Sequence, residues 1–292
     1  MLRQFDRRLG LDKKIFLSYN GYGMSASGLF DSKGVFRMIF TVDAGNTNIV
    51  LGGFENDRLL FTSRIATQTA LMADEYAVKF NEILALYGYK SSDISGAIVS
   101  SVVTPLTPVF GAALERLGGF RTIVVGPGIK TGVNIKIDDP AVLGADLVCG
   151  AVGAMEKYDP PCVIFDLGTA TTISAIDRNR FFLGGSIIPG VKVSLKALSA
   201  TAAALPDINT ELTGDVLIGT NTVDSMKSGS IIGTASMMDG MAVRYKEAIG
   251  QDATVIATGG LAPAVLPYCR EKFILDETLL IDGLYTLYKK NV

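Results

Sequence analysis

The sequence predicts an α/β protein built from two half-domains of duplicated topology. The stretches DAGNTNIVLGGF, residues 43–54, and DLGTATTISAID, residues 166–177, align with Asp43 on Asp166 and Gly45 on Gly168. Each stretch begins where an apolar, β-branched run ends and continues into another such run, which is typical of a strand–turn–strand unit. A unit that occurs twice in one chain indicates a duplicated architecture.

The first half reads as three strands, a helix and two further strands. The first three strand-forming runs are separated by hairpin-length turns, and the last two are short and apolar. Between them, apolar residues recur at helical spacing over residues 74–89, which predicts a helix. The predicted strands are residues 38–45, 47–54, 58–65, 96–103 and 121–126.

The second half repeats the strand pattern and then becomes mainly helical. A run of small residues predicts a helix that ends before Pro160, and the strand–turn–strand pattern follows it. After Pro189, we expect helices around one buried strand that ends in the glycine turn ATGG. The predicted helices are residues 141–158, 223–249 and 278–288, with strands within 162–190 and at 253–260.

We expect a leader or disordered extension over residues 1–37, an N-terminal half-domain over 38–155 and a C-terminal half-domain over 156–292. The leader has no long apolar run and no small-residue cleavage site, so it does not resemble a signal peptide. No apolar run reaches the ~18 residues of a membrane span, so we expect no membrane partner.

Composition excludes several kinds of chemistry. The net charge of −2 offers no basic footprint for nucleic acid, so small-molecule partners are expected. The chain has no histidine, which excludes an imidazole base and a site of cysteine and histidine ligands. Cys149, Cys162 and Cys269 lie in apolar stretches, as expected for reduced, buried thiols of a cytoplasmic protein. Proton transfer therefore falls to Asp or Glu.

The two acidic turns suggest a phosphate site. Backbone N–H groups and hydroxyls of a glycine-containing turn can hold phosphate oxygens while the aspartate binds a cation. One such turn alone is more often only structural. Here the turn occurs in both halves, and ATGG at residues 257–260 adds a third glycine turn.

This three-part pattern resembles the actin, sugar kinase and Hsp70 superfamily, in which two ribonuclease H-like domains clamp ATP in a cleft between two phosphate loops and an adenosine loop. Within it, the chain is most similar to type III pantothenate kinases, from Met38 to the end of the chain. The resemblance implies transfer of the ATP γ-phosphoryl group to the primary hydroxyl of pantothenate, which starts coenzyme A synthesis. The matching signatures are DAGNTN, RIAT…ADEY, DDPAVLGADL, DLGTATT, GGSIIPG, ALSATAAALP and GLYTLYKKN.

The resemblance also implies the nucleotide and cation ligands. Asp43 would hold Mg²⁺, Thr169 would contact ATP from the second loop, and Asp166 would bind a monovalent cation, K⁺ or NH₄⁺. The first loop would hold the phosphates through Asp43, Ala44, Gly45, Asn46, Thr47 and Asn48. Metal ions, backbone dipoles and hydroxyls would then replace the lysine of a P-loop.

On the acceptor side, the resemblance makes Asp146 the catalytic base and Gly144, Ala145 and Leu147 part of the substrate loop. It places Thr201 in the active site of a neighbouring subunit, which implies a homodimer with shared sites. From the residues alone, Asp146 is equally a helix-start residue favoured by the helix dipole, and Thr201 equally a solvent-facing residue.

Two positions depart from the family pattern. Leu147 stands where the family has an arginine, and Ile137 stands where it has an aromatic residue, usually tyrosine. A carboxylate-bearing acceptor would lose a charge-assisted contact through the first change. Two alternatives therefore stay open: a kinase of the same fold for another small hydroxyl acceptor, and a nucleotide-binding regulatory protein without turnover. The regulatory protein would need no base at Asp146.

Overall fold

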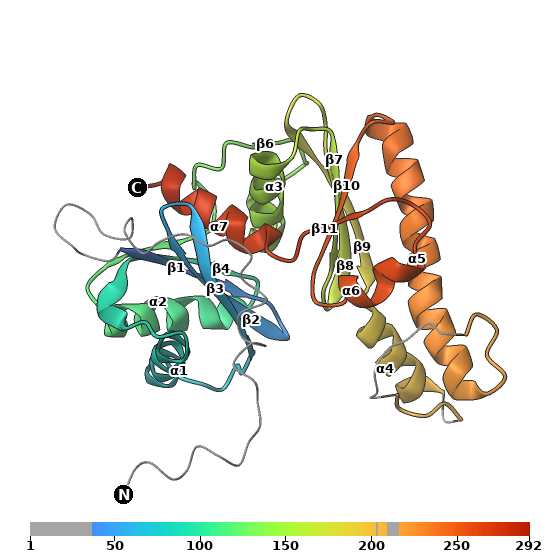
Figure 1. Cartoon of the computed structure of the whole chain (residues 1–292), viewed down its shortest axis with the longest axis horizontal. Coiled ribbons are helices and arrows are strands. Elements are labelled where there is room, and N and C mark those ends of the chain that lie inside the picture. Colours follow the sequence, from blue (N-terminus) through green and yellow to red (C-terminus); the bar gives the residue numbers. More distant parts are fainter. Residues whose placement is uncertain (1–36, 203, 209–215) are drawn as a thin grey trace, which may run out of the picture. The chain divides into compact units, whose positions relative to one another are not determined.

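The computed structural model describes residues 37–202, 204–208 and 216–292, and Figure 1 shows their arrangement. The leader expected over residues 1–37 lies outside this part of the chain, apart from Arg37. The described residues form two mixed sheets with helices packed against them.

The first sheet has the strand order β3-β2-β1-β4-β5. Strands β1, β2 and β3 form an antiparallel meander, and β4 and β5 add parallel to β1. All five lie within the ranges where the sequence predicts strands, give or take two residues. Their bounds are β1 Met38–Ala44, β2 Asn48–Glu55, β3 Arg58–Ala66, β4 Ile94–Ser101 and β5 Arg121–Val124.

The second sheet repeats this plan. Its order is β11-β10-β7-β8-β9-β6, so β9-β8-β7-β10-β11 matches the first sheet strand for strand. The short β6 is an addition, parallel to β9 at the far edge. The predicted duplicated topology is therefore confirmed. The bounds are β6 Asn134–Ile135, β7 Cys162–Leu167, β8 Ala170–Ile176, β9 Phe181–Pro189, β10 Thr254–Thr258 and β11 Ile274–Leu275.

The helices differ from the sequence prediction in several places, and no bounds were predicted for the helices at residues 191–201 and 262–265. The helix predicted from residue 141 begins at Ala145, because residues 140–142 form a 3₁₀ turn and Gly144 is the extended N-cap. Helix α2 was not predicted; Pro108 lies in its first turn, where proline is tolerated. The helices are α1 Ala73–Leu86, α2 Thr107–Leu117, α3 Ala145–Lys157, α4 Val191–Thr201, α5 Thr222–Ile249, α6 Ala262–Val265 and α7 Leu279–Lys290.

Helices cover both faces of the first sheet. On one face, aromatic residues of α1 and α2 pack together and against β1: the Phe40 and Phe80 rings meet edge to face at 5.8 Å, and the Tyr76 and Phe110 rings at 4.9 Å. On the other face, α7 and α3 contribute Leu284 and Val152 to a core cluster with Ile98 of β4. The last helix of the chain thus covers its first sheet.

Glycines allow α3 and α7 to run side by side (Figure 1). A Cβ atom on Gly153 would lie 2.2 Å from the carbonyl oxygen of Leu279, and one on Gly283 would lie 2.0 Å from that of Cys149. Any side chain at either position would push the two backbones apart. Helix α7 packs on the first sheet but belongs to the second half of the sequence. The boundary between the two half-domains at residues 155/156 therefore stays a prediction.

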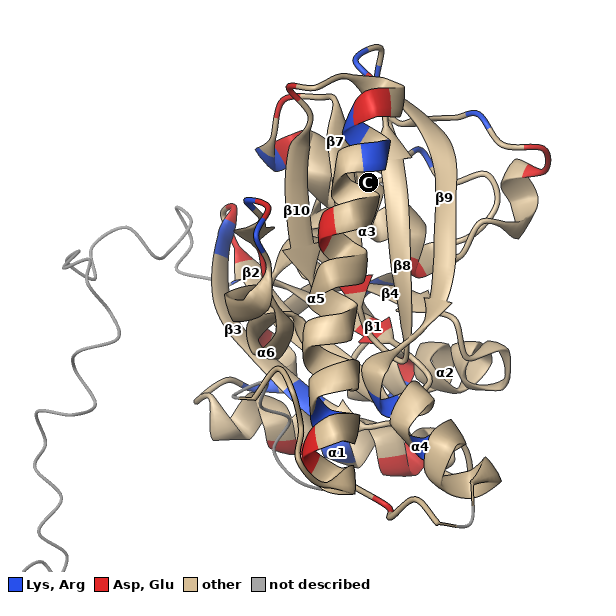
Figure 2. Cartoon of the chain, turned by 90° about the vertical axis from the view of Figure 1, so that its right-hand side faces the viewer, with Lys and Arg blue, Asp and Glu red and all other residues tan. Residues whose placement is uncertain are grey.

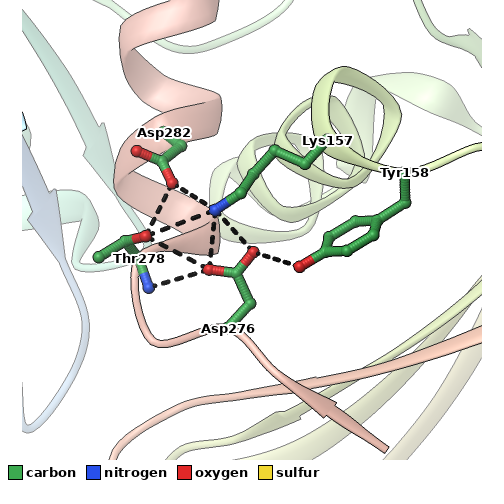
Figure 3. A network of polar contacts seen from close by, with 5 residues as sticks. All are labelled: Lys157, Tyr158, Asp276, Thr278 and Asp282. Carbon is green, nitrogen blue, oxygen red and sulfur yellow. Dashed lines mark hydrogen bonds and ion pairs between the residues drawn. The ribbon is translucent and has the colours of Figure 1, made fainter. Parts of the chain in front are cut away.

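A polar network joins the end of α3 to the start of α7 (Figure 3). The ammonium of Lys157 lies 2.7 Å from carboxylate oxygens of both Asp276 and Asp282, and the Tyr158 hydroxyl donates to Asp276 at 2.9 Å. Burial alone would lower the pKa of Lys157, but its hydrogen bonds to the two aspartates outweigh that effect and raise it. The network therefore fixes the crossover between the second sheet and α7.

Charged residues of both signs are interspersed over the described elements, as Figure 2 shows. Within residues 37–202, 204–208 and 216–292, no helix combines the length and apolar character that a membrane crossing requires. The three cysteines are free thiols; Cys149 and Cys162 are buried, as expected, whereas Cys269 is partly exposed.

Candidate active site

The first loop is a tight turn between β1 and β2. The Gly45 N–H donates to the Asn48 carbonyl at 3.0 Å and closes the turn. Asn46, Thr47 and Asn48 are exposed, whereas Ala44 is buried. The turn thus presents hydroxyl, amide and backbone N–H groups to a ligand, as the phosphate-loop prediction requires.

Residues of the RIAT and ADEY signatures brace this turn. The Thr67 hydroxyl donates to the Gly45 carbonyl at 2.6 Å, and the Thr67 N–H donates to the Thr47 carbonyl at 3.0 Å. The Tyr76 hydroxyl donates to the Gln68 carbonyl and accepts from its N–H, which fixes the chain just after Thr67. The sequence showed these signatures but not the role of Thr67, because the contact depends on the pairing of β2 with β3.

The second loop meets the first. The Gly168 N–H donates to the Ala170 carbonyl at 3.0 Å, and the Gly190 N–H donates to the Thr169 carbonyl at 3.1 Å. The Thr169 hydroxyl lies 2.7 Å from the Thr47 hydroxyl of the first loop. The structure therefore brings together the two acidic turns of the sequence repeat.

The ATGG turn packs against the second loop. Thr258, the last residue of β10, pairs with Asp166 of β7. Gly259 has a φ of +89°, and a Cβ on it would lie 2.4 Å from an Asp166 carboxylate oxygen. The Leu261 N–H then donates to the Leu167 carbonyl. A glycine is required here both by the backbone conformation and by the close approach of the carboxylate.

Three carboxylates lie near enough to influence one another. Burial raises the pKa of Asp43 to about 7, the Ser100 hydroxyl lowers it in part, and the charges of Asp146 and Asp166 raise it further. Burial also raises the pKa of Asp166 to about 6, with a further contribution from Asp146. The pKa of Asp146 is raised by burial as well. Such shifts favour a bound cation, which would allow the carboxyls to ionise.

The surroundings of Asp43 fit a cation. Ser100 pairs with Asp43 across β4 and β1, and its hydroxyl is fully buried. This hydroxyl influences the pKa of Asp43, yet it lacks the geometry of a full hydrogen bond to any described residue. An unpartnered buried oxygen beside a carboxylate is a potential ligand or ligand support.

The protein alone supplies too few ligands for a closed metal site. In the described part of the chain, no three acidic or thiol groups lie close enough to hold one metal ion. Mg²⁺ is commonly held by one or two carboxylates together with substrate phosphates and water. Asp43 therefore fits an ion that arrives with a nucleotide better than a resident one.

Asp146 lies in the first turn of α3, directly after the N-cap Gly144 and Ala145. One of its carboxylate oxygens accepts from the Leu147 N–H at 2.8 Å, and a Cβ on Gly144 would lie 2.5 Å from that same oxygen. This hydrogen bond agrees with a helix-start role. Its charge also raises the pKa of Asp43 and of Asp166, so the Asp146 carboxyl lies within electrostatic reach of both.

The two departures from the family pattern lie in one apolar cluster. Leu147 and Ile137 are both partly buried against a core group that includes Phe182 and Ala151. Ile137 also contacts the backbone at Gly184, in the GGSIIPG signature. The wall beside Asp146 is thus apolar at both positions. The sequence revealed the two substitutions but not that they share a cluster.

Thr201 lies apart from these groups within the chain. It is the last residue of α4, exposed, and its hydroxyl donates to the Ala197 carbonyl at 2.6 Å. A cavity of about 980 Å³ lies nearby, between α4, the end of β9 and α5. Its walls include Leu198, Met226 and Gly229, but no residue of the three loops.

Two solved structures share this fold at low sequence identity. The ethanolamine utilization protein EutJ from Carboxydothermus hydrogenoformans aligns with a TM-score of 0.51 at 13% identity, over 84% of this chain and 88% of that one. A putative N-acetylglucosamine kinase from Porphyromonas gingivalis aligns with a TM-score of 0.50 at 14% identity, over 87% and 99%. These similarities support the predicted two-lobed α/β fold and nothing further.

Sequence comparison gives the family. The family model described as type III pantothenate kinase matches residues 39–244. A type III pantothenate kinase from Bacillus cytotoxicus is 41% identical over 254 residues, which cover 87% of this chain and 97% of the relative. Another from Geobacillus sp. is 41% identical over 255 residues, which cover 87% and 98%. The chain therefore belongs to the type III pantothenate kinase family.

Proposed function

We propose that this protein transfers the γ-phosphoryl group of ATP to the primary hydroxyl of pantothenate, the step that starts coenzyme A synthesis in the cytoplasm. The observation that carries the proposal is the meeting of the two loops at Thr47 and Thr169, beside the coupled carboxyls of Asp43, Asp146 and Asp166. Family membership indicates the reaction, and the arrangement of these residues supports them as its site.

The nucleotide phosphates lie, in this proposal, against the exposed first loop. Gly45, Asn46, Thr47 and Asn48 offer N–H groups and side chains there, and Thr169 adds a hydroxyl from the opposite loop. Phosphoryl transfer depends mainly on positioning and charge neutralisation, which suits a site of backbone donors and hydroxyls. The brace from Thr67 supports the proposal, since it holds the turn in shape.

Two cations complete the nucleotide side. Asp43, with the Ser100 hydroxyl beside it, would hold Mg²⁺, and Asp166 would hold K⁺ or NH₄⁺. When bound, these ions neutralise phosphate charge that no lysine of the loops neutralises. The raised pKa values support the assignment, because each carboxyl gains most from a cation that favours its ionised form.

Asp146 is the base in this proposal. Its carboxylate accepts the proton of the acceptor hydroxyl as the phosphoryl group transfers. The raised pKa makes the carboxylate a stronger base than an exposed aspartate, which favours proton transfer near neutral pH.

The test is pantothenate-dependent ADP release by the wild type and by Asp146→Asn. We expect kcat to fall by about 10²- to 10⁴-fold while ATP affinity changes little. Asp74→Asn is the matched control, since Asp74 also lies in the first turn of a helix, but its side chain is exposed and pairs with Arg116. Equal activity of Asp146→Asn and Asp74→Asn would leave Asp146 with only a helix-start role.

A kinase for another small hydroxyl acceptor is the second candidate, and the apolar cluster at Leu147 and Ile137 favours it. If Leu147 marks only a lost contact, Leu147→Arg should lower the KM for pantothenate with kcat nearly unchanged. The gain in binding free energy for pantothenate should be at most that of one charge-assisted hydrogen bond, about 1.5–3 kcal/mol. No ADP release with pantothenate from either protein, but release with another hydroxy acid, would establish the second candidate.

A homodimer with shared sites completes the proposal, with Thr201 reaching the acceptor of the partner. The exposed position of Thr201 supports this, as do the exposed apolar side chains of Leu198, Leu217 and Ile218 near the α4–α5 cavity. Mixing Asp146→Asn with Thr201→Ala subunits should generate hybrid dimers with one intact site. The mixture should show the wild-type KM for pantothenate. Mixed dimers that do not recover this KM would argue against shared sites.

A further inference from the structure

Arg64 lies on the same face of the first sheet as Asp43. In the strand register, Arg64 of β3 pairs with Val50 of β2, Val50 pairs with Asp43 of β1, and Asp43 pairs with Ser100 of β4. Directly paired residues of neighbouring strands point to the same face of a sheet. With a strand spacing of about 4.8 Å, Arg64 starts roughly 10 Å from Asp43 along this row.

The guanidinium of Arg64 reaches the ATGG turn of the second sheet. A Cβ on Gly260 would lie 2.5 Å from Nη1 and 3.6 Å from Nη2 of Arg64. The close approach therefore depends on glycine at position 260. The positive charge also lowers the pKa of Asp166, which otherwise is raised by burial. Arg64 thus brings a cation to the point where the second loop and the glycine turn meet.

The donors of Arg64 are not used by the part of the chain that the structure describes. Its side chain is exposed, and it forms no hydrogen bond or ion pair with residues 37–202, 204–208 or 216–292. An arginine guanidinium has several N–H donors in a rigid fork that matches phosphate oxygens. Asp43, Asp146 and Asp166 make this region acidic, which disfavours an anionic ligand. The positive charge of Arg64 would therefore contribute strongly to binding a phosphate.

We propose that Arg64 is a nucleotide-binding residue whose guanidinium contacts the phosphate chain of the bound nucleotide from β3. The inference rests on the proposed function and deepens it, since it gives the RIAT signature a second role beside the brace from Thr67. Arg64 supplies the side-chain cation that the glycine and hydroxyl loops lack. Its contact with Gly260 holds the guanidinium between the two sheets, where it faces the ligand.

The experiment measures binding of ADP and of adenosine, with magnesium present, to four proteins: wild type, Arg64→Gln, Arg64→Lys and Arg58→Gln. Arg58 is the matched control, because it is an exposed arginine at the other end of the same strand, about 20 Å away. Melting temperatures of the nucleotide-free proteins check that each variant is folded.

We expect Arg64→Gln to weaken ADP binding by about 10- to 100-fold and Arg64→Lys by less, with adenosine binding unchanged in both. Arg58→Gln should bind ADP like the wild type. The proposal is overturned if Arg64→Gln binds ADP as tightly as the wild type, if lysine rescues nothing, or if adenosine and ADP weaken equally. The test measures only nucleotide binding. If the wild type does not phosphorylate pantothenate, the proposed function is wrong, but the ADP-binding test of Arg64 still applies.

Discussion

The two acidic loops share a backbone plan but differ in their surroundings. Both aspartates lie on the central strand of a sheet, and a glycine N–H closes the turn after each. Both are influenced by the charge of Asp146, but Asp43 has the Ser100 hydroxyl as its parallel neighbour, whereas Asp166 has the cation Arg64 within electrostatic reach. The duplication therefore kept the backbone geometry of the turn while the electrostatic environment diverged.

The loops are also held differently. A side chain, Thr67, braces the first loop from its own sheet. The second loop is held by backbone donors, the N–H groups of Gly190 and Leu261, which come from the end of β9 and from the ATGG turn. Replacing the Thr67 side chain can therefore loosen the first loop, whereas no single side-chain replacement removes the backbone hydrogen bonds that hold the second loop.

The largest expected difference between the loops concerns turnover. Asp43→Asn should lower magnesium-dependent kcat by roughly 10²-fold or more, because an amide does not neutralise a divalent ion as a carboxylate does. Steady-state assays of ADP release across a magnesium titration measure this. A variant that regains full kcat at high magnesium would have lost only affinity, and Asp43 would then not act in the transition state.

The pH dependence of stability should separate Asp43 from an ordinary surface carboxylate. Burial raises the pKa of Asp43 in the folded protein from its ordinary value of 3.8 to about 7, so the folded state binds the proton more tightly. This contribution to stability is complete below pH 3.8 and is lost as the pH rises towards 7. At neutral pH, nucleotide-free Asp43→Asn should therefore be more stable than the wild type, on the order of a few kcal/mol.

Urea unfolding of the nucleotide-free proteins between acidic and neutral pH measures this effect. The wild type should lose stability over that range more steeply than Asp43→Asn. Parallel curves for the two proteins would show that burial does not raise the pKa of Asp43.

A smaller effect is expected at the second loop. Asp166→Asn should act through the monovalent cation, lowering activity by about tenfold and removing its dependence on potassium. Titrating potassium against sodium in the ADP-release assay distinguishes the two proteins. An unaltered potassium response in the variant would remove Asp166 from the cation site.

The smallest effect is expected from the brace. Thr67→Val removes the hydroxyl that donates to Gly45 and should raise the KM for ATP by about fivefold, the value of one ordinary hydrogen bond of ~1 kcal/mol. Thr62→Val is the control, because Thr62 is an exposed threonine of β3, the strand that ends directly before Thr67. If both variants behave alike, the brace contributes nothing to nucleotide binding.

The sequence predicted the repeated turns well because their signals are local: an acidic residue, a glycine and flanking β-branched runs. Signals that depend on pairing were not predictable. The strands β6 and β11 have two residues each and are defined only by their neighbours. Helix α2 contains Pro108 and Gly111, which mask its apolar spacing.

Residues of the site itself show the same division. Asp43, Asp146 and Asp166 stand in recognisable motifs, and the structure places them near one another. Ser100 and Arg64 join them only through the register of four strands, which no periodicity in the sequence specifies. Their roles and those of the motif residues stay predictions until the variants are measured.

The glycine-mediated packing of α7 on α3 has a consequence for how the protein is made. Residues 279–290 emerge from the ribosome after both sheets, yet they cover a face of the sheet that is synthesised first. Until then, apolar residues of the first sheet such as Ile98 have no complete core to enter. The nascent chain must therefore carry an open sheet face through most of translation, and exposed apolar surface of this kind favours aggregation over that interval.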